Sequence, residues 1–325
     1  MKKRNLEIDI LRGIAMITVI LIHTSYYFIN DKTALFLWRW SQFAVPVFIF
    51  CSAYIFFQNT KQLNFEYLKK RIFRLLKPYY IFLLFFFPVI YFVNPQILNL
   101  NYIFQSLLTI GGVDVSWLVL LFMYLTIIFP LISLCFEKNK YLFWAYSFLS
   151  FASSILLIFY KLTFSYKLIF WLPWSIVALF ALFFVKFEAR SKILKITSFI
   201  CGIIFVSFYF LLSRINHNLG FIENKYPPNI YFLSYGLFSI MILYFLSKII
   251  IPNKRTTSMI SFFSKNSYPI FFIHYIFLIL FSPYLKTLNL NWFTFFSSIL
   301  LITSIVQLGI NKLGNQNPQS KLAKP

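Results

Sequence analysis

The chain has few charged residues and few glycines. Only 12% of its 325 residues are Asp, Glu, Lys or Arg, about half the fraction usual in a soluble domain. Eight glycines and no alternating ten-residue strands argue against a β-barrel. The hydrophobic residues, 60% of the chain, instead fall in blocks of about 17–22, the length at which a helix crosses a bilayer. The composition therefore predicts an all-α, polytopic membrane helix bundle.

Several motifs are missing as well. There is no Gly-rich phosphate loop and no Gly-x-Ser-x-Gly nucleophile elbow. The three cysteines, Cys51, Cys135 and Cys201, lie far apart in apolar blocks, which predicts buried free thiols and neither a disulfide framework nor zinc-ligand spacing. We therefore expect no metal site and no bound cofactor.

Hydropathy places ten spans in the chain. We expect them at residues 8–29, 37–57, 78–93, 117–136, 141–159, 168–185, 196–213, 230–250, 266–283 and 292–310. A short interfacial helix is expected at 101–110. The basic start of the chain resembles a signal peptide, but no small-residue cleavage site follows. The first block is therefore expected to stay as an uncleaved membrane helix. Residues 1–310 form the predicted membrane domain, and 311–325 a short, loose tail.

The basic residues orient these spans. With both termini in the cytoplasm, twenty-two of the thirty Lys and Arg residues fall in cytoplasmic segments and seven in outer ones. The exception is Arg12, inside the first span. This bias explains the net charge of +22 by topology and contact with anionic lipids, without nucleic acid. The outer loops, expected at 30–36, 94–116, 160–167, 214–229 and 284–291, would select any outer substrate.

Arg12 and His23 are the polar residues of the first span that most need an explanation. An arginine at the bilayer centre costs about 2.5–3.5 kcal/mol on insertion scales, so a buried one usually has a partner or a function. Eleven steps of about 100° place His23 within about 20° of Arg12 around a helix, and roughly 16 Å along its axis. The spacing predicts a cation near one membrane edge and an imidazole deep inside, on one face. Imidazole is suited to accept a proton near neutral pH.

Asp9 lies one turn before Arg12 and can form a local ion pair that holds its guanidinium; snorkelling of Arg12 to the headgroups is the alternative. Of the other two histidines, His217 falls in an outer loop, where a surface role is expected. His274 falls in the ninth span, where an interhelical hydrogen bond and a functional role are equally open.

A basic cluster, Lys70, Arg71, Arg74 and Lys77, recurs at helical spacing before the third span. On its own it predicts an amphipathic helix lying on anionic lipid. The alternative is a phosphate clamp, because arginines bind phosphate oxygens in bidentate fashion.

These motifs together resemble the acyltransferase-3 family, bacterial integral-membrane O-acyltransferases of surface polysaccharides. The family pattern is an arginine, ten residues and a histidine in the first helix, and an Arg-x-x-Arg after the second. Here Arg12 and His23 match the first, and Arg71 and Arg74 the second. Further matches are Asp9 and Gly13 beside Arg12, Ser116-Trp117-Leu118 opening the fourth span, and Asn266-Ser267-Tyr268 leading to His274. The resemblance covers essentially the whole chain.

The resemblance implies an enzyme of the bacterial inner membrane. Acyl-CoA, in the first place acetyl-CoA, is the implied co-substrate from the cytoplasm, with its phosphates held by Arg71 and Arg74. Arg12 is implied in admitting or orienting the donor, and His23 in acting as general base on a sugar hydroxyl or in carrying the acyl group. Asp9, His274 and Trp117 are expected to support this site. The acceptor, the acyl chain length and the oligomeric state stay open.

Two other functions stay open too. A polysaccharide exporter or flippase needs a wide polar pathway and no acyl donor. A coupled transporter also needs intramembrane acids, and of the eight acids only Asp9 and Asp114 lie near membrane edges. The other alternative is a non-catalytic subunit within polysaccharide synthesis machinery, which would need neither Arg12 nor His23 for acylation.

Overall fold

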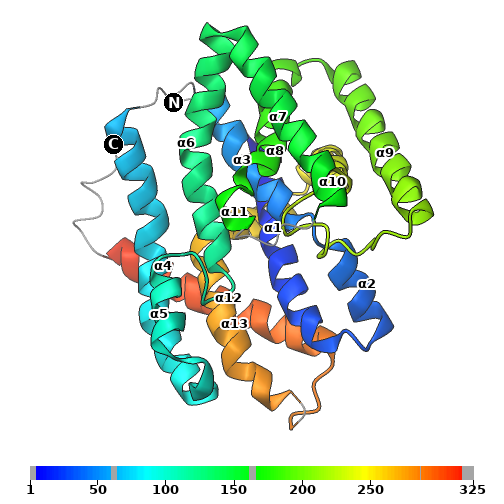
Figure 1. Cartoon of the computed structure of the whole chain (residues 1–325). Coiled ribbons are helices and arrows are strands. Elements are labelled where there is room, and N and C mark those ends of the chain that lie inside the picture. Colours follow the sequence, from blue (N-terminus) through cyan, green and yellow to red (C-terminus); the bar gives the residue numbers. More distant parts are fainter. Residues whose placement is uncertain (1–4, 60–63, 161–165, 286, 317–325) are drawn as a thin grey trace.

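The computed structural model describes residues 5–59, 64–160, 166–285 and 287–316, and there the chain is a bundle of helices (Figure 1). The α-helices are α1 (Leu6–Ser25), α2 (Lys32–Trp40), α3 (Ala44–Gln58), α4 (Phe65–Val93), α5 (Leu100–Leu107), α6 (Ser116–Lys138), α7 (Lys140–Phe159), α8 (Trp171–Phe187), α9 (Ser191–Arg214), α10 (Ile230–Ile250), α11 (Lys254–Lys265), α12 (Ser267–Phe281) and α13 (Trp292–Gln316). Short 3₁₀ turns are η1 (Tyr26–Phe28), η2 (Pro95–Ile97), η3 (Tyr166–Leu168) and η4 (Ser282–Tyr284).

The predicted all-α polytopic bundle is confirmed. Eight helical segments are long and apolar enough to cross a membrane by length and composition, with α2 and α3 counted as one segment, and α8 is a shorter apolar helix of 17 residues. With the 20-residue α1, about 30 Å long at 1.5 Å per residue, the described chain holds ten candidate spans. The short helix expected at 101–110 is α5.

Three helices extend beyond the segments expected to cross the membrane. The third span was expected from residue 78, and its helix α4 already starts at Phe65, where the Asn64 side chain accepts a hydrogen bond from the Tyr67 amide at 2.7 Å. The outer loop expected at 30–36 is partly α2, capped by Asp31 on the Ala34 amide at 2.8 Å. The helix of the last span, expected to end at 310, continues to Gln316 as α13. Cap residues extend these helices into polar sequence that hydropathy alone assigns to loops.

One helix was not expected from the sequence. Residues 254–265 lie between the spans expected at 230–250 and 266–283, and they form α11, whose start is capped by Asn253 on the Thr256 amide at 3.1 Å. The helix packs closely on α1. The approach is tight at Gly13, where an added Cβ would lie 2.3 Å from the carbonyl oxygen of Ile260. Only glycine allows α11 to lie so close to the first helix.

The first helix is the centre of the bundle. It contacts α2, α3, α10, α11, α12 and α13, and 13 of its 20 residues are buried. By contrast, α9 runs along the edge of the bundle (Figure 1) and buries only Leu194, Cys201 and Leu212. The polar side chains of α1 are therefore surrounded by protein.

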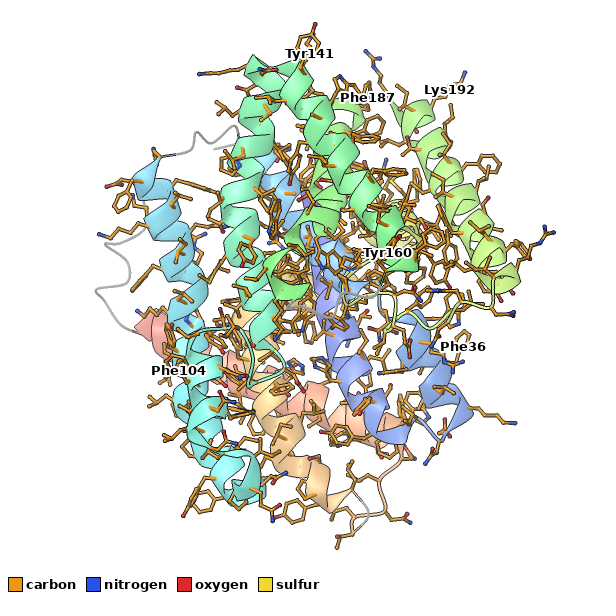
Figure 2. The ribbon with its side chains drawn as sticks, viewed as in Figure 1. Phe36, Phe104, Tyr141, Tyr160, Phe187 and Lys192 are labelled. Atoms are coloured by element: carbon orange, nitrogen blue, oxygen red, sulfur yellow. The ribbon has the colours of Figure 1, made fainter. Side chains whose placement is uncertain are left out.

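The outer surface is aromatic and aliphatic. Figure 2 shows Phe36, Phe104 and Tyr141 at the outside of the bundle, with 60%, 61% and 90% of their surface exposed. Tyr160 is 67% exposed. Such large exposed side chains are unfavourable in water and favourable against lipid or at its interface. The cysteines are free, with Cys51 and Cys201 buried as predicted and Cys135 partly buried.

Candidate functional site

Two cavities open along α1. The larger, about 730 Å³, lies around the C-terminal end of α1 and is lined by His23, Asp114, Trp117, Lys225 and Tyr275 among other residues; we name it the His23 cavity. The smaller, about 290 Å³, lies around the N-terminal half of α1 and is lined by Arg12, Arg71 and Arg74 among others; we name it the Arg12 cavity. Arg12 and His23, which are spaced along α1, thus lie in two different cavities.

The His23 cavity contains a pair of histidines. The Nδ1 atom of His23 lies 2.9 Å from Nε2 of His274, and the two rings are stacked with centroids 5.2 Å apart. His274 comes from α12 and is fully buried, whereas His23 is partly exposed to the cavity. The two rings tie the first span to the ninth.

The second ring nitrogen of His274 fixes the direction of this bond. His274 Nδ1 lies 3.0 Å from the carbonyl oxygen of Ile270. A carbonyl oxygen can only accept, so the Nδ1 atom of His274 carries the proton. In the neutral ring Nε2 then accepts from His23 Nδ1. This assignment leaves Nε2 of His23 unprotonated and able to act as a base.

Aromatic and polar side chains surround this pair. The Tyr275 ring lies edge-on to His23, with centroids 5.9 Å apart, and its hydroxyl donates to Asp114 Oδ2 at 3.4 Å. Trp117, at the start of α6, contacts Tyr226 edge-on at 4.9 Å between centroids. Trp117, which was expected to support the site, lines the same cavity as His23.

Arg71 and Arg74 lie in the same cavity as Arg12 because α4 continues through the basic cluster. Ser267 and Tyr268, from the start of α12, line it too. The Tyr268 hydroxyl donates to the carbonyl oxygen of Leu75 at 2.7 Å, which fixes α12 against α4. Two members of the basic cluster, Arg71 and Arg74, thus line a cationic cavity together with Arg12, whereas Lys70 is exposed.

Asp9 lies near this second cavity. Its side chain is only 4% exposed, and its Oδ1 accepts a hydrogen bond from Ser264 of α11 at 3.2 Å. Asp9 therefore links α1 to α11, the helix that the sequence did not reveal.

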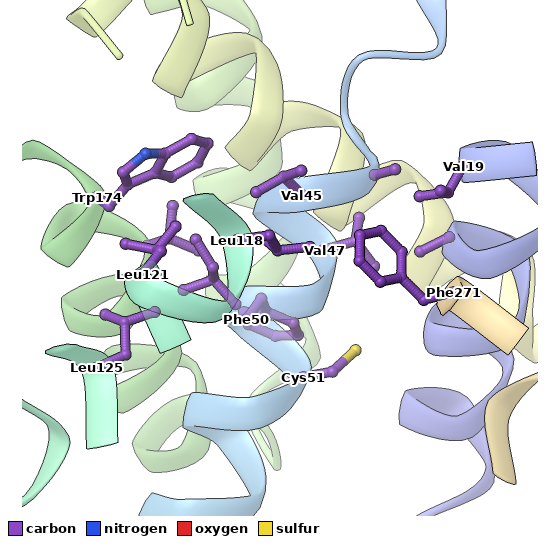
Figure 3. Close-up of a cluster of buried hydrophobic side chains, with 14 of the residues drawn as sticks. Val19, Val45, Val47, Phe50, Cys51, Leu118, Leu121, Leu125, Trp174 and Phe271 are labelled. Carbon is purple, nitrogen blue, oxygen red and sulfur yellow. The ribbon is translucent and has the colours of Figure 1, made fainter. Parts of the chain in front are cut away.

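A thin apolar wall separates the cavities. Leu118 and Phe271 line both of them, and each is only 7% exposed. Figure 3 shows both side chains within a buried apolar cluster that includes Val47 and Phe50. Arg12 and His23 consequently line different cavities, which share Leu118 and Phe271.

Lys225 is a cavity residue that sequence reasoning missed. Topology placed it in the outer loop after α9 as an ordinary solvated charge. In the structure it is only 6% exposed, and burial lowers its pKa from 10.5 to about 7. A single lysine in a loop gives no sequence signal that distinguishes it from a surface residue. His217, from the same loop, pairs with Asn224 Oδ1 at 3.1 Å and takes no part in either cavity.

Comparison with known proteins shows the family of the chain. The family model of the acyltransferase-3 type, described as an acyltransferase domain, matches residues 5–309, nearly the whole chain. Searches of curated proteins and of solved structures gave no significant match. The matched range contains every residue of the two cavities.

Proposed function

The chain belongs to the acyltransferase-3 family, and from this premise we propose that it is an O-acyltransferase of the bacterial plasma membrane. Its donor is acyl-CoA, with acetyl-CoA as the first choice, bound from the cytoplasm. Its acceptor is a hydroxyl of a sugar or surface polysaccharide on the outer side. Family membership supports a multi-pass membrane acyltransferase, and the arrangement of the two cavities supports the finer assignment.

The Arg12 cavity is suited to the phosphates of the donor. Arg12, Arg71 and Arg74 bring three guanidinium groups to one cavity, and guanidinium binds phosphate oxygens through paired, charge-assisted hydrogen bonds. Under the predicted topology this cavity faces the cytoplasm, where acyl-CoA is found. With its phosphates here, the pantetheine arm would run along α1 toward His23, a distance of roughly 16 Å at 1.5 Å per residue.

The His23 cavity is suited to the transfer step. The acceptor hydroxyl gives its proton to His23 Nε2 while its oxygen attacks the carbonyl carbon of the thioester. The carbonyl electrons move to oxygen, and the intermediate collapses by expelling the CoA thiolate, which takes the proton back from His23. His274 accepts from His23 Nδ1 and so holds the tautomer that this step needs.

The wall formed by Leu118 and Phe271 is the observation that carries this proposal. It lets the donor headgroup and the acceptor occupy separate cavities while only the narrow acyl-pantetheine arm has to pass between them. An exporter of polysaccharide needs a continuous wide polar path instead. The apolar, buried character of both wall residues favours the acyltransferase.

The test is mass spectrometry of surface glycans from a deletion strain complemented with variants at equal protein level. We expect wild type to restore O-acylation and His23→Ala to abolish it. Lys32→Gln is the control, because this lysine is exposed at the start of α2 and lines neither cavity, and it should behave like wild type. Normal acylation by His23→Ala would refute the assignment of the base.

A second measurement separates the enzyme from its alternatives. Purified protein is titrated with acetyl-CoA by calorimetry, and release of free CoA is followed. Binding that is lost in Arg71→Gln supports the enzyme, whereas an exporter would show no binding. If acylation persisted with both Arg12 and His23 replaced while polymer was lost, the chain would be a non-catalytic subunit of the polysaccharide synthesis machinery.

A further inference from the structure

Lys225 is held inside the His23 cavity by its own loop. The Asn224 side chain donates to the carbonyl oxygens of Asn218 and Gly220, both at 2.7 Å, and accepts from Asn229. These bonds fold residues 218–229 back on themselves, and Asn224 is only 1% exposed. The loop therefore directs the adjacent Lys225 inward.

The ammonium group of Lys225 has an oriented but neutral environment. It donates to Gln42 Oε1 at 3.1 Å, and Gln42 is itself fixed because its Nε2 donates to the carbonyl oxygen of Trp38 at 2.7 Å. The ammonium also lies over the rings of Trp117 and Tyr226, at 5.7 and 5.1 Å from their centroids. These contacts position the charge without neutralising it.

No carboxylate within the described residues forms an ion pair with Lys225. A buried cation without a counter-charge is unfavourable. Because the hydrogen-bond acceptor named for the ammonium is the neutral amide of Gln42, further N–H groups of Lys225 remain to be satisfied. Such a group is retained where a ligand or a reaction step supplies negative charge. The other lysine in this cavity, Lys167, is partly exposed and donates to the carbonyl oxygen of Ile110 at 2.7 Å.

We propose that Lys225 is a further catalytic residue, which stabilises the oxyanion formed when the acceptor hydroxyl attacks the thioester. The inference rests on the proposed acyl transfer at His23, and it supplies the electrophilic partner that this step otherwise lacks, because Arg12 lies beyond the apolar wall. The thioester carbonyl oxygen gains the electron pair of its π bond, Lys225 donates a hydrogen bond to it, and the charge is released when the CoA thiolate leaves.

Hydrolysis of acetyl-CoA by the purified full chain in nanodiscs tests this role, because water then replaces the unidentified acceptor. Lys225→Met keeps the side-chain length and removes the charge. We expect it to lower kcat about 10²- to 10³-fold, the usual effect of removing one oxyanion donor, with the KM for acetyl-CoA within about twofold. Lys225→Arg should retain part of the activity. Lys32→Gln is the matched control, an exposed lysine at the start of α2, and should match wild type.

Thermal stability provides the second readout. If Lys225 serves the reaction, Lys225→Met removes an uncompensated buried charge, and its Tm should equal or exceed that of wild type. A lower Tm with unchanged kcat would show a structural role and overturn the proposal. Normal hydrolysis combined with lost glycan acylation in cells would assign Lys225 to acceptor binding and overturn it as well.

The two levels of proposal fail separately. If His23→Ala abolishes hydrolysis and Lys225→Met does not, only the role of Lys225 is wrong. If His23→Ala hydrolyses acetyl-CoA as fast as wild type, the proposed base is wrong, and the oxyanion role built on it is withdrawn.

Discussion

His23 and His274 form a hydrogen-bonded pair, 2.9 Å from Nδ1 to Nε2, although 251 positions separate them in the sequence. The Ile270 carbonyl oxygen accepts from the other nitrogen of His274 and thereby makes His274 the acceptor in the pair. This arrangement has the logic of a base held by an orienting group, with a neutral imidazole in place of a carboxylate.

His274 should therefore act as a positioning residue. His274→Ala leaves His23 free to rotate and to take the wrong tautomer, and we expect kcat to fall about 10²- to 10⁴-fold with little change in KM. His274→Gln offers an amide oxygen to His23 Nδ1 and should recover part of the loss. The rate of acetyl-CoA turnover measures both. Equal losses in the two variants would point to packing instead of orientation.

Arg71 should contribute to donor affinity and not to the chemical step. Losing a charge-assisted hydrogen bond to phosphate costs about 1.5–3 kcal/mol, so Arg71→Gln should raise the Kd for acetyl-CoA about 10- to 10²-fold. Lys70→Gln is the matched control, because Lys70 lies on the same helix, is exposed and pairs with Glu66 at 2.9 Å. Calorimetric titration measures the Kd for acetyl-CoA of both variants. Equal values would show that Arg71 does not bind the donor.

The apolar wall should control passage of the acyl arm. Leu118→Trp enlarges a side chain that lines both cavities, so we expect acyl transfer to fall at least tenfold while acetyl-CoA still binds. Ile127→Trp is the control on the same helix, because Ile127 is 42% exposed on the outside of α6. Parallel measurements of Kd and turnover separate the two effects. Unchanged turnover in Leu118→Trp would place the donor path elsewhere.

The positions of the membrane helices could be predicted from the sequence, but the structure of the segments that join them could not. Blocks of apolar residues identified the membrane helices because burial in lipid demands them over about 20 positions. The sequence did not reveal α11, because residues 254–265 are as polar as a loop. The helix depends on the cap at Asn253 and on packing against Gly13. The family motifs singled out Arg12, His23, Arg71 and Arg74 as candidate site residues, and each of them lines one of the two cavities. The position of the two cavities beside each other depends on contacts between segments that are distant in sequence. The orientation of Lys225 into the His23 cavity depends on such contacts too.

Gly13 should be needed for the fold around the Arg12 cavity. An added Cβ would lie 2.3 Å from the backbone oxygen of Ile260, so Gly13→Ala must push α11 away, at a cost of about 1–3 kcal/mol. Gly309→Ala, in α13, meets nothing within 4 Å and should stabilise its helix by about 0.5–1 kcal/mol. Thermal unfolding in detergent compares the two. A Tm for Gly13→Ala at or above that of wild type would contradict the tight contact.

The buried Lys225 should leave a signature in the pH dependence of stability. Burial lowers its pKa in the folded protein to about 7, against 10.5 for the free side chain. Between these values the unfolded chain binds one more proton, so the free energy of unfolding rises with pH. Below pH 7 Lys225 is protonated in both the folded and the unfolded protein, so the folded protein carries the full cost of the buried charge. This cost falls as the pH rises from about 7 toward 10.5.

The measurement is the Tm of wild type minus that of Lys225→Met at several pH values. The other titratable groups facing this cavity are the same in both proteins: His23, Tyr26, Tyr27, Asp114, Lys167, Tyr226 and Tyr275. The difference therefore reports Lys225 together with its electrostatic coupling to His23. We expect it to become more positive by a few degrees between pH 6.5 and about 9. A constant difference over this range would mean that the ammonium keeps its proton, and hence that the folded protein supplies it with a counter-charge.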